Sequence, residues 1–423
     1  AVSGGVNGIY AYDLYGSGAL TITATGAVTG TSGKGIYANA YGNTGTDLTI
    51  SAASVTGATS GIYAINSGKG ALTITATGDV TGTQASGIFA YGYGTDLTIS
   101  AAAVSGGTRG ILVVNYGSGA LAITTTGAVS GAASSGMDVT GYGTDLTISA
   151  ASVSGGGNGI KATNKGTGAL SITTTGSVSA AGDYSDGISA INYGTDLTIS
   201  VHSVSGGKYE KAVYARNNGS GKLSITVSGA VVAGADDHAI GIETNAADGG
   251  EVAIHLLSTS SVSGPDAIKD LGGDAVVTID AGAVVTGAIS LEYGNDTLTI
   301  ASGVNLSGVT FMSGGSDDAY DSKDFTDTLN ISSGWSGALN DWEVINADTS
   351  GGDFALSGFS LGNRSFSKLG AGTLTLNSCF NPSARVSVTC MVSIFFRLRR
   401  ARAARQCSIF QGAALQPASG SAD

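Results

Sequence analysis

Proline and cysteine are scarce in this chain of 423 residues, which has three of each against 69 glycines, and only 12% of its residues are charged. The cysteines, Cys379, Cys390 and Cys407, all lie near the C-terminal end. The long cysteine-free remainder needs no disulfides for stability and is compatible with export. Abundant glycine with few aromatic residues is not typical of an ordinary globular domain and favours a repeat protein with many thin core layers.

Basic residues and long apolar runs near the start are missing as well. The formal net charge is −12, whereas a nucleic-acid-binding protein needs a basic stripe to neutralise phosphates, so we expect no nucleic-acid partner. The first residues contain no initiator methionine, no basic segment and no long apolar run. We therefore expect neither a signal peptide nor a membrane anchor there.

A short phrase, "ALTITAT" at residues 19–25, returns in near copies about every 25 residues. In this copy Leu20 and Ile22 alternate with Thr21 and Thr23, which is the period of two expected for a strand with one buried face. The leucines that mark the copies are Leu20, Leu48, Leu72, Leu97, Leu121, Leu146, Leu170, Leu197 and Leu223, with weaker echoes at Val252, Val277 and Leu298.

Two further apolar phrases, of the types "GIYA" and "AVTG", flank each copy and predict three short strands per repeat. A unit of this size without a helix cannot bury its apolar face alone, but it can do so by stacking on its neighbours. We therefore predict an all-β fold, a parallel and right-handed β-solenoid of roughly twelve coils with ladders spaced about 4.8 Å apart. Glycine is assigned to corners that need positive φ. Propellers and antiparallel sandwiches are the less favoured alternatives.

Three segments carry a family pattern: "YGNDTLTIASGVNLSG" at 293–308, "DTLNISSG" at 327–334 and "SKLGAGTLTLN" at 367–377. Together with the Gly/Thr/Ser-rich coils, they make the chain up to Asn377 resemble the passenger domains of bacterial autotransporters, the type V secretion proteins. The third segment is similar to their passenger-associated repeat. The resemblance implies a β-helical rod displayed at the cell surface or secreted through the outer membrane by a C-terminal barrel, which we expect this chain to lack.

The domain boundaries expected from these patterns are 1–310 for the solenoid repeats, 311–377 for a C-terminal extension with the passenger-associated repeat, and 378–423 for an atypical tail. The tail contains six arginines, no lysine and all three cysteines. We interpret it as disordered or derived from a frameshift. The alternative is a genuine basic appendage, in which the apolar run 386–396 would lie on a membrane surface.

Candidate chemistry is sparse. The histidines His202, His238 and His255 fall in different coils and match no catalytic or metal-binding motif, and "NNGSGKLS" at 217–224 is interpreted as a coil corner rather than a phosphate loop. The recurring "GTDL" aspartates precede strands, so we expect them to cap backbone N–H groups and not to catalyse; they are Asp47, Asp96, Asp145 and Asp196.

An acidic cluster at Asp317, Asp318, Asp321, Asp324 and Asp327 faintly resembles the calcium repeats of secreted toxins, and a solvated loop is the favoured interpretation. Outward threonine pairs such as Thr21/Thr23, Thr73/Thr75 and Thr147/Ser149 resemble the surface of solenoid ice-binding proteins, although Thr also simply prefers strands.

No catalytic, cofactor-binding or metal-ligating residue is therefore assigned, and no cofactor is expected. The function implied by the resemblance is that of a non-enzymatic adhesin or structural rod, whose partners would be cell-surface glycans, proteins or copies of itself. The alternatives are a carbohydrate-active lyase or hydrolase, which would need acidic and basic groups that converge across adjacent coils, and an ice-binding protein.

Overall fold

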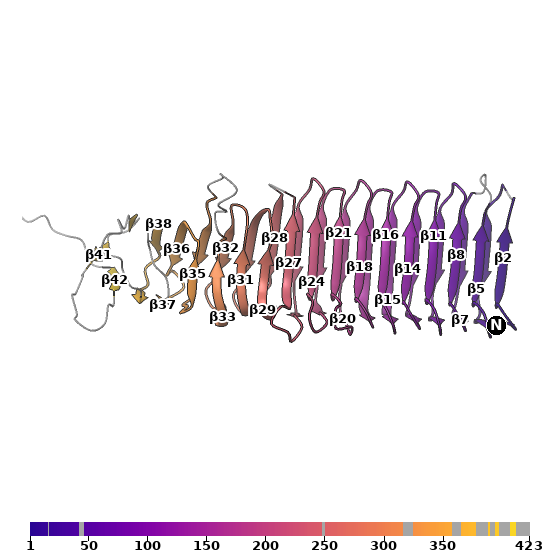
Figure 1. Ribbon diagram of the computed structural model, residues 1–423, viewed down its shortest axis with the longest axis horizontal. Coiled ribbons are helices and arrows are strands. Elements are labelled where there is room, and N and C mark those ends of the chain that lie inside the picture. The colour runs from indigo at the N-terminus through magenta and orange to yellow at the C-terminus, as the bar shows by residue number, and fades with distance from the viewer. Residues whose placement is uncertain are drawn as a thin grey trace, which may run out of the picture.

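The computed structural model describes residues 1–15, 17–41, 46–247, 250–315, 325–357 and 365–377, together with three short strands of the tail, Val388–Thr389, Ile394–Phe396 and Cys407–Gln411. Within these residues the fold is all-β, without a helix, and parallel strands stack into a β-solenoid of about 14 turns with coils about 25 residues apart (Figure 1). The fold class expected from the repeat is confirmed, and the rod has two coils more than the roughly twelve expected from the ladder spacing.

Each N-terminal coil contributes one strand to each of three columns. The first column consists of β2 (Ile9–Asp13), β5 (Ile36–Ala40), β8 (Ile62–Asn66), β11 (Ile88–Gly92), β14 (Ile111–Asn115), β16 (Met137–Gly141), β18 (Ile160–Asn164), β21 (Ile188–Asn192), β24 (Val213–Asn217) and β27 (Ile240–Ala246). The third consists of β1 (Val2–Gly4), β4 (Val28–Gly30), β7 (Val55–Gly57), β10 (Val80–Gly82), β13 (Val104–Gly106), β20 (Ser177–Ala180), β23 (Ser203–Ser205) and β26 (Ala230–Val232).

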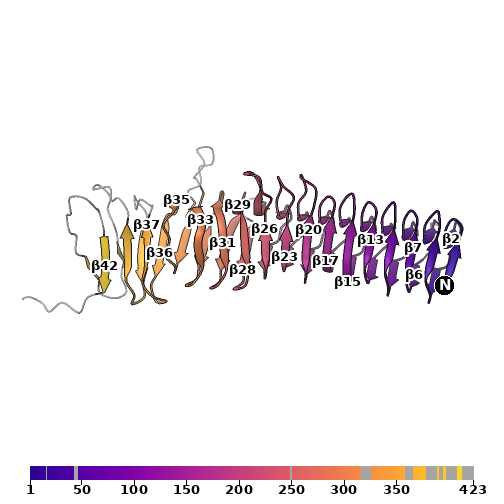
Figure 2. The same ribbon diagram turned by 90° about the horizontal axis from the view of Figure 1, so that it is seen from below.

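The second column is the longest and runs almost the length of the rod (Figure 2). Two of its strands, β15 and β17, continue without a break into the third column. It consists of β3 (Leu20–Ala24), β6 (Leu48–Ala52), β9 (Leu72–Ala76), β12 (Leu97–Ala101), β15 (Leu121–Gly131), β17 (Leu146–Gly155), β19 (Leu170–Thr174), β22 (Leu197–Val201), β25 (Leu223–Val227), β28 (Glu251–Leu256), β30 (Asp274–Ile279), β32 (Thr297–Ile300), β34 (Thr328–Ile331), β36 (Val344–Asp348) and β38 (Ser365–Leu369).

Equivalent aliphatic side chains lie directly above one another inside the coils. Leu97 pairs in parallel register with Leu72 on one side and Leu121 on the other, and all three side chains are buried. A neighbouring isoleucine ladder follows the same register. Full burial of one such side chain stabilises the fold by about 1.5–3 kcal/mol, so the core depends on many identical thin layers.

Two of the weaker leucine echoes belong to a different ladder from the one expected. Val252 does pair with Leu223, but Val277 pairs with Ile254 and Leu298 pairs with Val277, so the latter two continue the isoleucine ladder. A slide of two residues keeps every side chain on the same face of a strand, so the sequence pattern cannot reveal it. The leucine ladder continues instead from Val252 to Ala275 and then to Asp296. Val276 pairs with Thr297, so the residues just before them, Ala275 and Asp296, lie side by side in adjacent coils.

The cross-section changes toward the C-terminal end. The third and first columns merge there into single long strands, β29 (Ser261–Asp270), β31 (Val284–Leu291) and β33 (Asn305–Ser313), followed by the short β35 (Ala338–Asn340). The fully buried Trp342 and the buried Phe366 replace the small aliphatic side chains. A separate sheet contains β37 (Phe354–Ser357), β39 (Leu374–Asn377) and two strands of the tail, β41 (Ile394–Phe396) and β42 (Cys407–Gln411).

The corner glycines of the first coils serve close packing, and the expectation of positive φ is wrong for them. Among the described residues, glycines with positive φ begin only at Gly272. A Cβ atom on Gly87 would lie 2.5 Å from Cγ1 of Val104 and 2.7 Å from the carbonyl oxygen of Ser105. Glycine is therefore required there because the next coil approaches the backbone too closely for any side chain.

Candidate functional site

The "GTDL" aspartates bind backbone, as expected, and each one ties its coil to the next. Oδ1 of Asp96 accepts a hydrogen bond of 2.8 Å from the backbone N–H of Ala120, one coil further on. The other three make the same contact, with Ala71, Ala169 and Lys222 as donors for Asp47, Asp145 and Asp196, respectively. A carboxylate already engaged by backbone N–H groups at a regular corner favours a structural role over catalysis.

Buried asparagines that were not among the expected site residues lie beside these caps, and three of them, Asn164, Asn192 and Asn217, form a continuous asparagine ladder. Asn192 is fully buried; its Nδ2 donates to the carbonyl oxygens of Thr195 and Asp196 and to Oδ1 of Asn217, at 2.9, 3.2 and 3.0 Å. Its own Oδ1 accepts from Nδ2 of Asn164 at 3.1 Å. The signal was present in the sequence, because each asparagine lies four residues after the first residue of its first-column strand: Asn66, Asn115, Asn164, Asn192 and Asn217.

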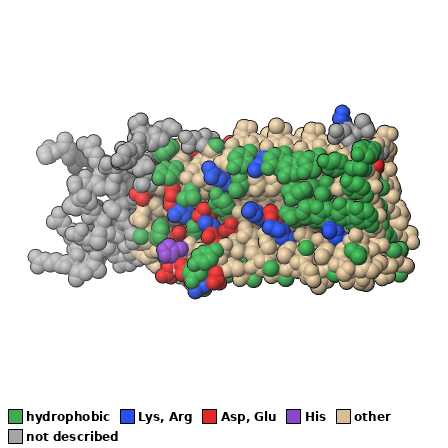
Figure 3. Space-filling model, turned by 45° about the vertical axis from the view of Figure 1, so that its right-hand side comes forward, with side chains coloured by type: hydrophobic (Ala, Val, Ile, Leu, Met, Phe, Trp, Pro, Cys, Tyr) green, Lys and Arg blue, Asp and Glu red, His purple; other side chains and the backbone are tan. Residues whose placement is uncertain are grey.

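The outer surface of the first column is apolar over the first five coils. We call this surface, formed by outward side chains of β2, β5, β8, β11 and β14, the aromatic face; Figure 3 shows hydrophobic side chains gathered over the N-terminal part of the rod. Tyr10 is 63% exposed, and most of the others are half-buried by their neighbours along the column. The aromatic face comprises the nine apolar outward residues of these strands, and the tenth outward position is the polar Asn39; the nine are Tyr10, Tyr12, Tyr37, Tyr63, Ile65, Phe89, Tyr91, Leu112 and Val114.

The rings of the aromatic face are stacked along the rod. Ring centroids lie 4.8 Å apart for Tyr10 and Tyr37, 5.4 Å for Tyr37 and Tyr63, and 4.4 Å for Tyr63 and Phe89, with interplanar angles of 6° or less. The Lys34 ammonium lies 4.9 Å from the Tyr63 centroid. Because each ring covers the faces of its neighbours, a partner meets ring edges and tyrosine hydroxyls rather than open ring faces.

The outward hydroxyls of the second column form two regular columns over the first nine coils. All but one of the eighteen positions carry Thr or Ser, the exception being Ala122. Neighbouring positions lie about 4.8 Å apart along the rod and about 6.7 Å apart along a strand. The result is a flat array of hydroxyl and methyl groups on a rigid backbone.

Acidic and basic side chains converge across adjacent coils further along the rod, where the aromatic face has ended. Nζ of Lys211 lies 3.0 Å from Oε2 of Glu210, and Nζ of Lys269 lies 3.0 Å from Oε1 of Glu292. Between them, burial raises the pKa of Glu243, while the two lysines act to lower it. Since each lysine already has a carboxylate partner, this charge-paired cluster favours a structural role over acid–base catalysis.

The histidines remain separate. His202 contacts Ser228, His238 contacts Asp236 and His255 contacts Asp280, each through one ring nitrogen. In the part of the chain that the structure describes, no group of three or more His, Cys, Asp or Glu side chains could hold a metal ion. The phosphate-loop-like segment 217–224 is a corner between β24 and β25, in which Oδ1 of Asn217 accepts from the N–H of Gly219.

Most of the acidic cluster expected near residue 320 cannot be placed, because Asp317, Asp318, Asp321 and Asp324 lie outside the described residues. Asp327 is described, and it is buried in the wall of the solenoid rather than in a solvated loop. Its Oδ1 accepts from the N–H of Asp296 at 2.8 Å. The leucine column thus ends in carboxyl groups.

Asp296 is the most perturbed of these carboxyls. Its side chain is fully buried: Oδ1 accepts a 2.7 Å hydrogen bond from the N–H of Ala275, and Oδ2 is buried without a hydrogen-bond partner. Burial raises its pKa to about 9, and the neighbouring carboxyls of Asp327, Asp270 and Asp274 act in the same direction. Burial also raises the pKa of Asp270 to about 7, against the hydrogen bond from Thr244. At pH 7 Asp296 therefore favours the neutral form, whereas Asp270 populates both its neutral and its charged form.

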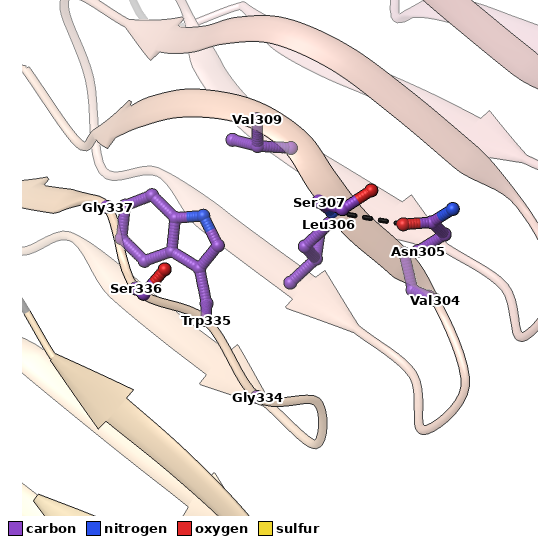
Figure 4. Close-up of a pocket in the computed structure, with 9 residues that line it drawn as sticks. All are labelled: Val304, Asn305, Leu306, Ser307, Val309, Gly334, Trp335, Ser336 and Gly337. Atoms are coloured by element: carbon purple, nitrogen blue, oxygen red, sulfur yellow. Dashed lines mark hydrogen bonds between the residues drawn. The ribbon is translucent and has the colours of Figure 1, made fainter.

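A cavity of about 510 Å³ opens between the coils that contain β33 and β35 (Figure 4). Its apolar wall consists of side chains that are themselves almost fully buried, including Leu306 and Trp335. The nine residues that line it carry no charge: Val304, Asn305, Leu306, Ser307, Val309, Gly334, Trp335, Ser336 and Gly337.

No protein-family model matches this chain, and neither a curated protein nor a solved structure matches it. Across the described residues, the chain forms no helix with the length and hydrophobicity needed to cross a bilayer.

Proposed function

We propose that this chain is a non-enzymatic passenger of the autotransporter type, displayed at the cell surface or secreted, which acts as an adhesin-like rod and binds glycans or proteins of a cell surface. The observation that carries the proposal is the aromatic face, an outward apolar surface on a rod whose other described outward columns are hydroxyl-rich or charged. Five strands of five residues cover on the order of 400 Å², the size of a functional patch on a soluble protein. A contact of that size is weak alone, and many rods on one surface would strengthen it by avidity.

Removing two central rings of the aromatic face should abolish most binding. We expect the Tyr63→Ser, Phe89→Ser double variant of the full chain to bind cells or glycan-array spots at least tenfold more weakly, because buried aromatic anchors commonly contribute more than about 1 kcal/mol each. The matched control is Tyr184→Ser with Tyr209→Ser, a stacked pair outside the aromatic face, whose binding should change less than twofold. Equal losses of binding affinity in both double variants would contradict the assignment of binding to the aromatic face.

The hydroxyl columns favour one second function, ice binding, because their two spacings form a regular lattice. Six of the eighteen positions carry Ser, which lacks the methyl group of Thr, and one carries Ala. This mixed composition favours ordinary strand packing of the columns.

We therefore expect the purified protein to show no thermal hysteresis and no shaping of ice crystals. The measurement is nanolitre osmometry on the full chain beside its Thr98→Tyr variant, which places a ring in the middle of one of the two hydroxyl columns. Hysteresis that is present in the parent and absent in Thr98→Tyr would replace the adhesin proposal with ice binding.

A further inference from the structure

The strand register skips a position at the cavity between β33 and β35. On its N-terminal side, β33 pairs with β31 over its whole length, through Asn305, Gly308, Val309, Met312 and Ser313, with two shifts of register. On its C-terminal side, β35 pairs only with Phe311–Ser313, so no described strand covers the edge of residues 305–310 there. The second column has no such gap, because its successive strands pair from β3 to β38.

The next segment of chain on this side, residues 334–337, pairs with the following coil and not, among the described residues, with β33. Trp335 forms a parallel bridge with Leu356, and its N–H donates to the carbonyl oxygen of Ala355 at 2.9 Å. The N–H of Ser357 donates back to the carbonyl oxygen of Trp335 at 3.1 Å. Residues 334–337 therefore pair with β37, and the cavity separates them from residues 305–309.

The chemistry of this space fits an extended peptide. The cavity of about 510 Å³ lies at the uncovered edge, and Leu306, Val309 and Trp335 form an apolar wall (Figure 4). An uncovered strand edge is completed by another strand, which supplies main-chain hydrogen bonds and places alternate side chains in the pocket. A chain of net charge −12 repels acidic peptides and attracts basic ones.

We propose that the gap between residues 305–309 and 334–337 binds an extended peptide of about five residues, with apolar side chains at alternate positions, basic flanks and no acidic residue. The bound peptide would add a strand parallel or antiparallel to β33 and seat one apolar side chain against Trp335. The site lies on the C-terminal coils, far along the rod from the aromatic face, so it is independent of the proposed adhesin function.

The experiment uses the unaltered full-length protein and changes the peptide. The probe is a fluorescein-labelled nonapeptide, Lys-Val-Thr-Val-Ser-Val-Thr-Val-Lys, whose binding is followed by fluorescence anisotropy. We expect saturable binding that weakens at least tenfold when alternate backbone nitrogens are methylated, because methylation removes main-chain donors and leaves every side chain in place. Replacing both lysines by aspartate should also weaken binding. Equal affinity for the methylated peptide, or no saturable binding of the unmodified one, overturns the proposal.

A pair of protein variants locates the site. Ser336→Tyr places a ring at the mouth of the cavity and should weaken binding of the unmodified probe at least tenfold, while Ser118→Tyr, the same change at an exposed corner of an N-terminal coil, should change it less than twofold. Equal effects of the two substitutions place the peptide elsewhere and overturn the assignment. The peptide proposal is also overturned if the protein binds no peptide but gives a glycan-array signal that Ser336→Tyr alone removes, because the gap then binds carbohydrate.

Discussion

Replacing Asp296 by asparagine should stabilise the C-terminal coils at neutral pH by on the order of 4 kcal/mol. The carboxyl lies in the core column that leucines occupy further up the rod, and its pKa is about 9 in the folded chain, against 3.8 for an exposed aspartate. At pH 7 the unfolded chain carries the charge and the folded chain does not, so folding must take up a proton. The amide keeps an acceptor for the N–H of Ala275 and never ionises.

The sign of the pH dependence follows from the same comparison. A carboxyl whose pKa is raised on folding binds more protons in the folded state, so its contribution to stability is greatest below about pH 4 and falls as the pH rises toward 9. Asp270, whose pKa is about 7, adds a similar fall between about pH 4 and 7. The gain from Asp296→Asn should therefore be largest at pH 8 and small at pH 5.

Tryptophan fluorescence is the appropriate measurement, because the only two tryptophans, Trp335 and Trp342, both lie in the C-terminal coils. Urea midpoints of parent and variant are compared at pH 5, 7 and 8. The control is Asp96→Asn, which changes an exposed cap and keeps its acceptor atom, and whose midpoint should not move. Identical midpoints for the parent and Asp296→Asn at pH 8 would contradict the neutral buried carboxyl.

Cutting the asparagine ladder should have the largest destabilising effect in the N-terminal coils. In Asn192→Ala, two backbone carbonyls and the side chains of Asn164 and Asn217 lose a partner inside a closed wall. Each buried polar group left without a partner costs about 1–3 kcal/mol, so we expect a loss of about 4 kcal/mol that is confined to the surrounding coils.

Native-state hydrogen exchange detects this local loss. Amides of β19, β22 and β25 should exchange faster by two to three orders of magnitude, whereas those of β3 and β6 should be unchanged, because each coil contacts only its neighbours. Thr198→Ala in the same coil removes an outward hydroxyl and serves as the control with little effect. Uniform acceleration along the whole rod would show that the coils unfold as one unit instead.

The sequence predicted most of the N-terminal fold because the repeat is redundant. The period of two in "LTITA" determined which side chains point inward, and near-identical copies determined the register of Leu72 with Leu97. The C-terminal coils were less predictable, because no copy constrains them. In "GNDTLTI", Asp296, Leu298 and Ile300 all point to the same face of the strand. The local pattern therefore does not show whether Asp296 lies in the core or at a corner, because the two registers differ by two residues.

The surfaces were less predictable than the core. The position of the aspartates just before a strand predicted that they cap backbone N–H groups. Their partners were not predictable, because the N–H that Asp96 accepts from belongs to the next coil. The aromatic face needs the parallel register that brings Tyr37 over Tyr10. The cavity beside Leu306 lies where no described strand pairs with that edge of β33, and a missing contact leaves no trace in a residue pattern.

The unbroken ladders also bear on how such a rod can change length. The first nine coils differ in the number of residues they contain, yet Leu20 and Leu223 stand in one continuous column, since the corners absorb the difference. A whole coil could therefore be gained or lost in evolution without turning any inward side chain outward. The length of the rod would then be set by duplication of single coils, and each coil would contribute its own outward side chains to every lateral surface.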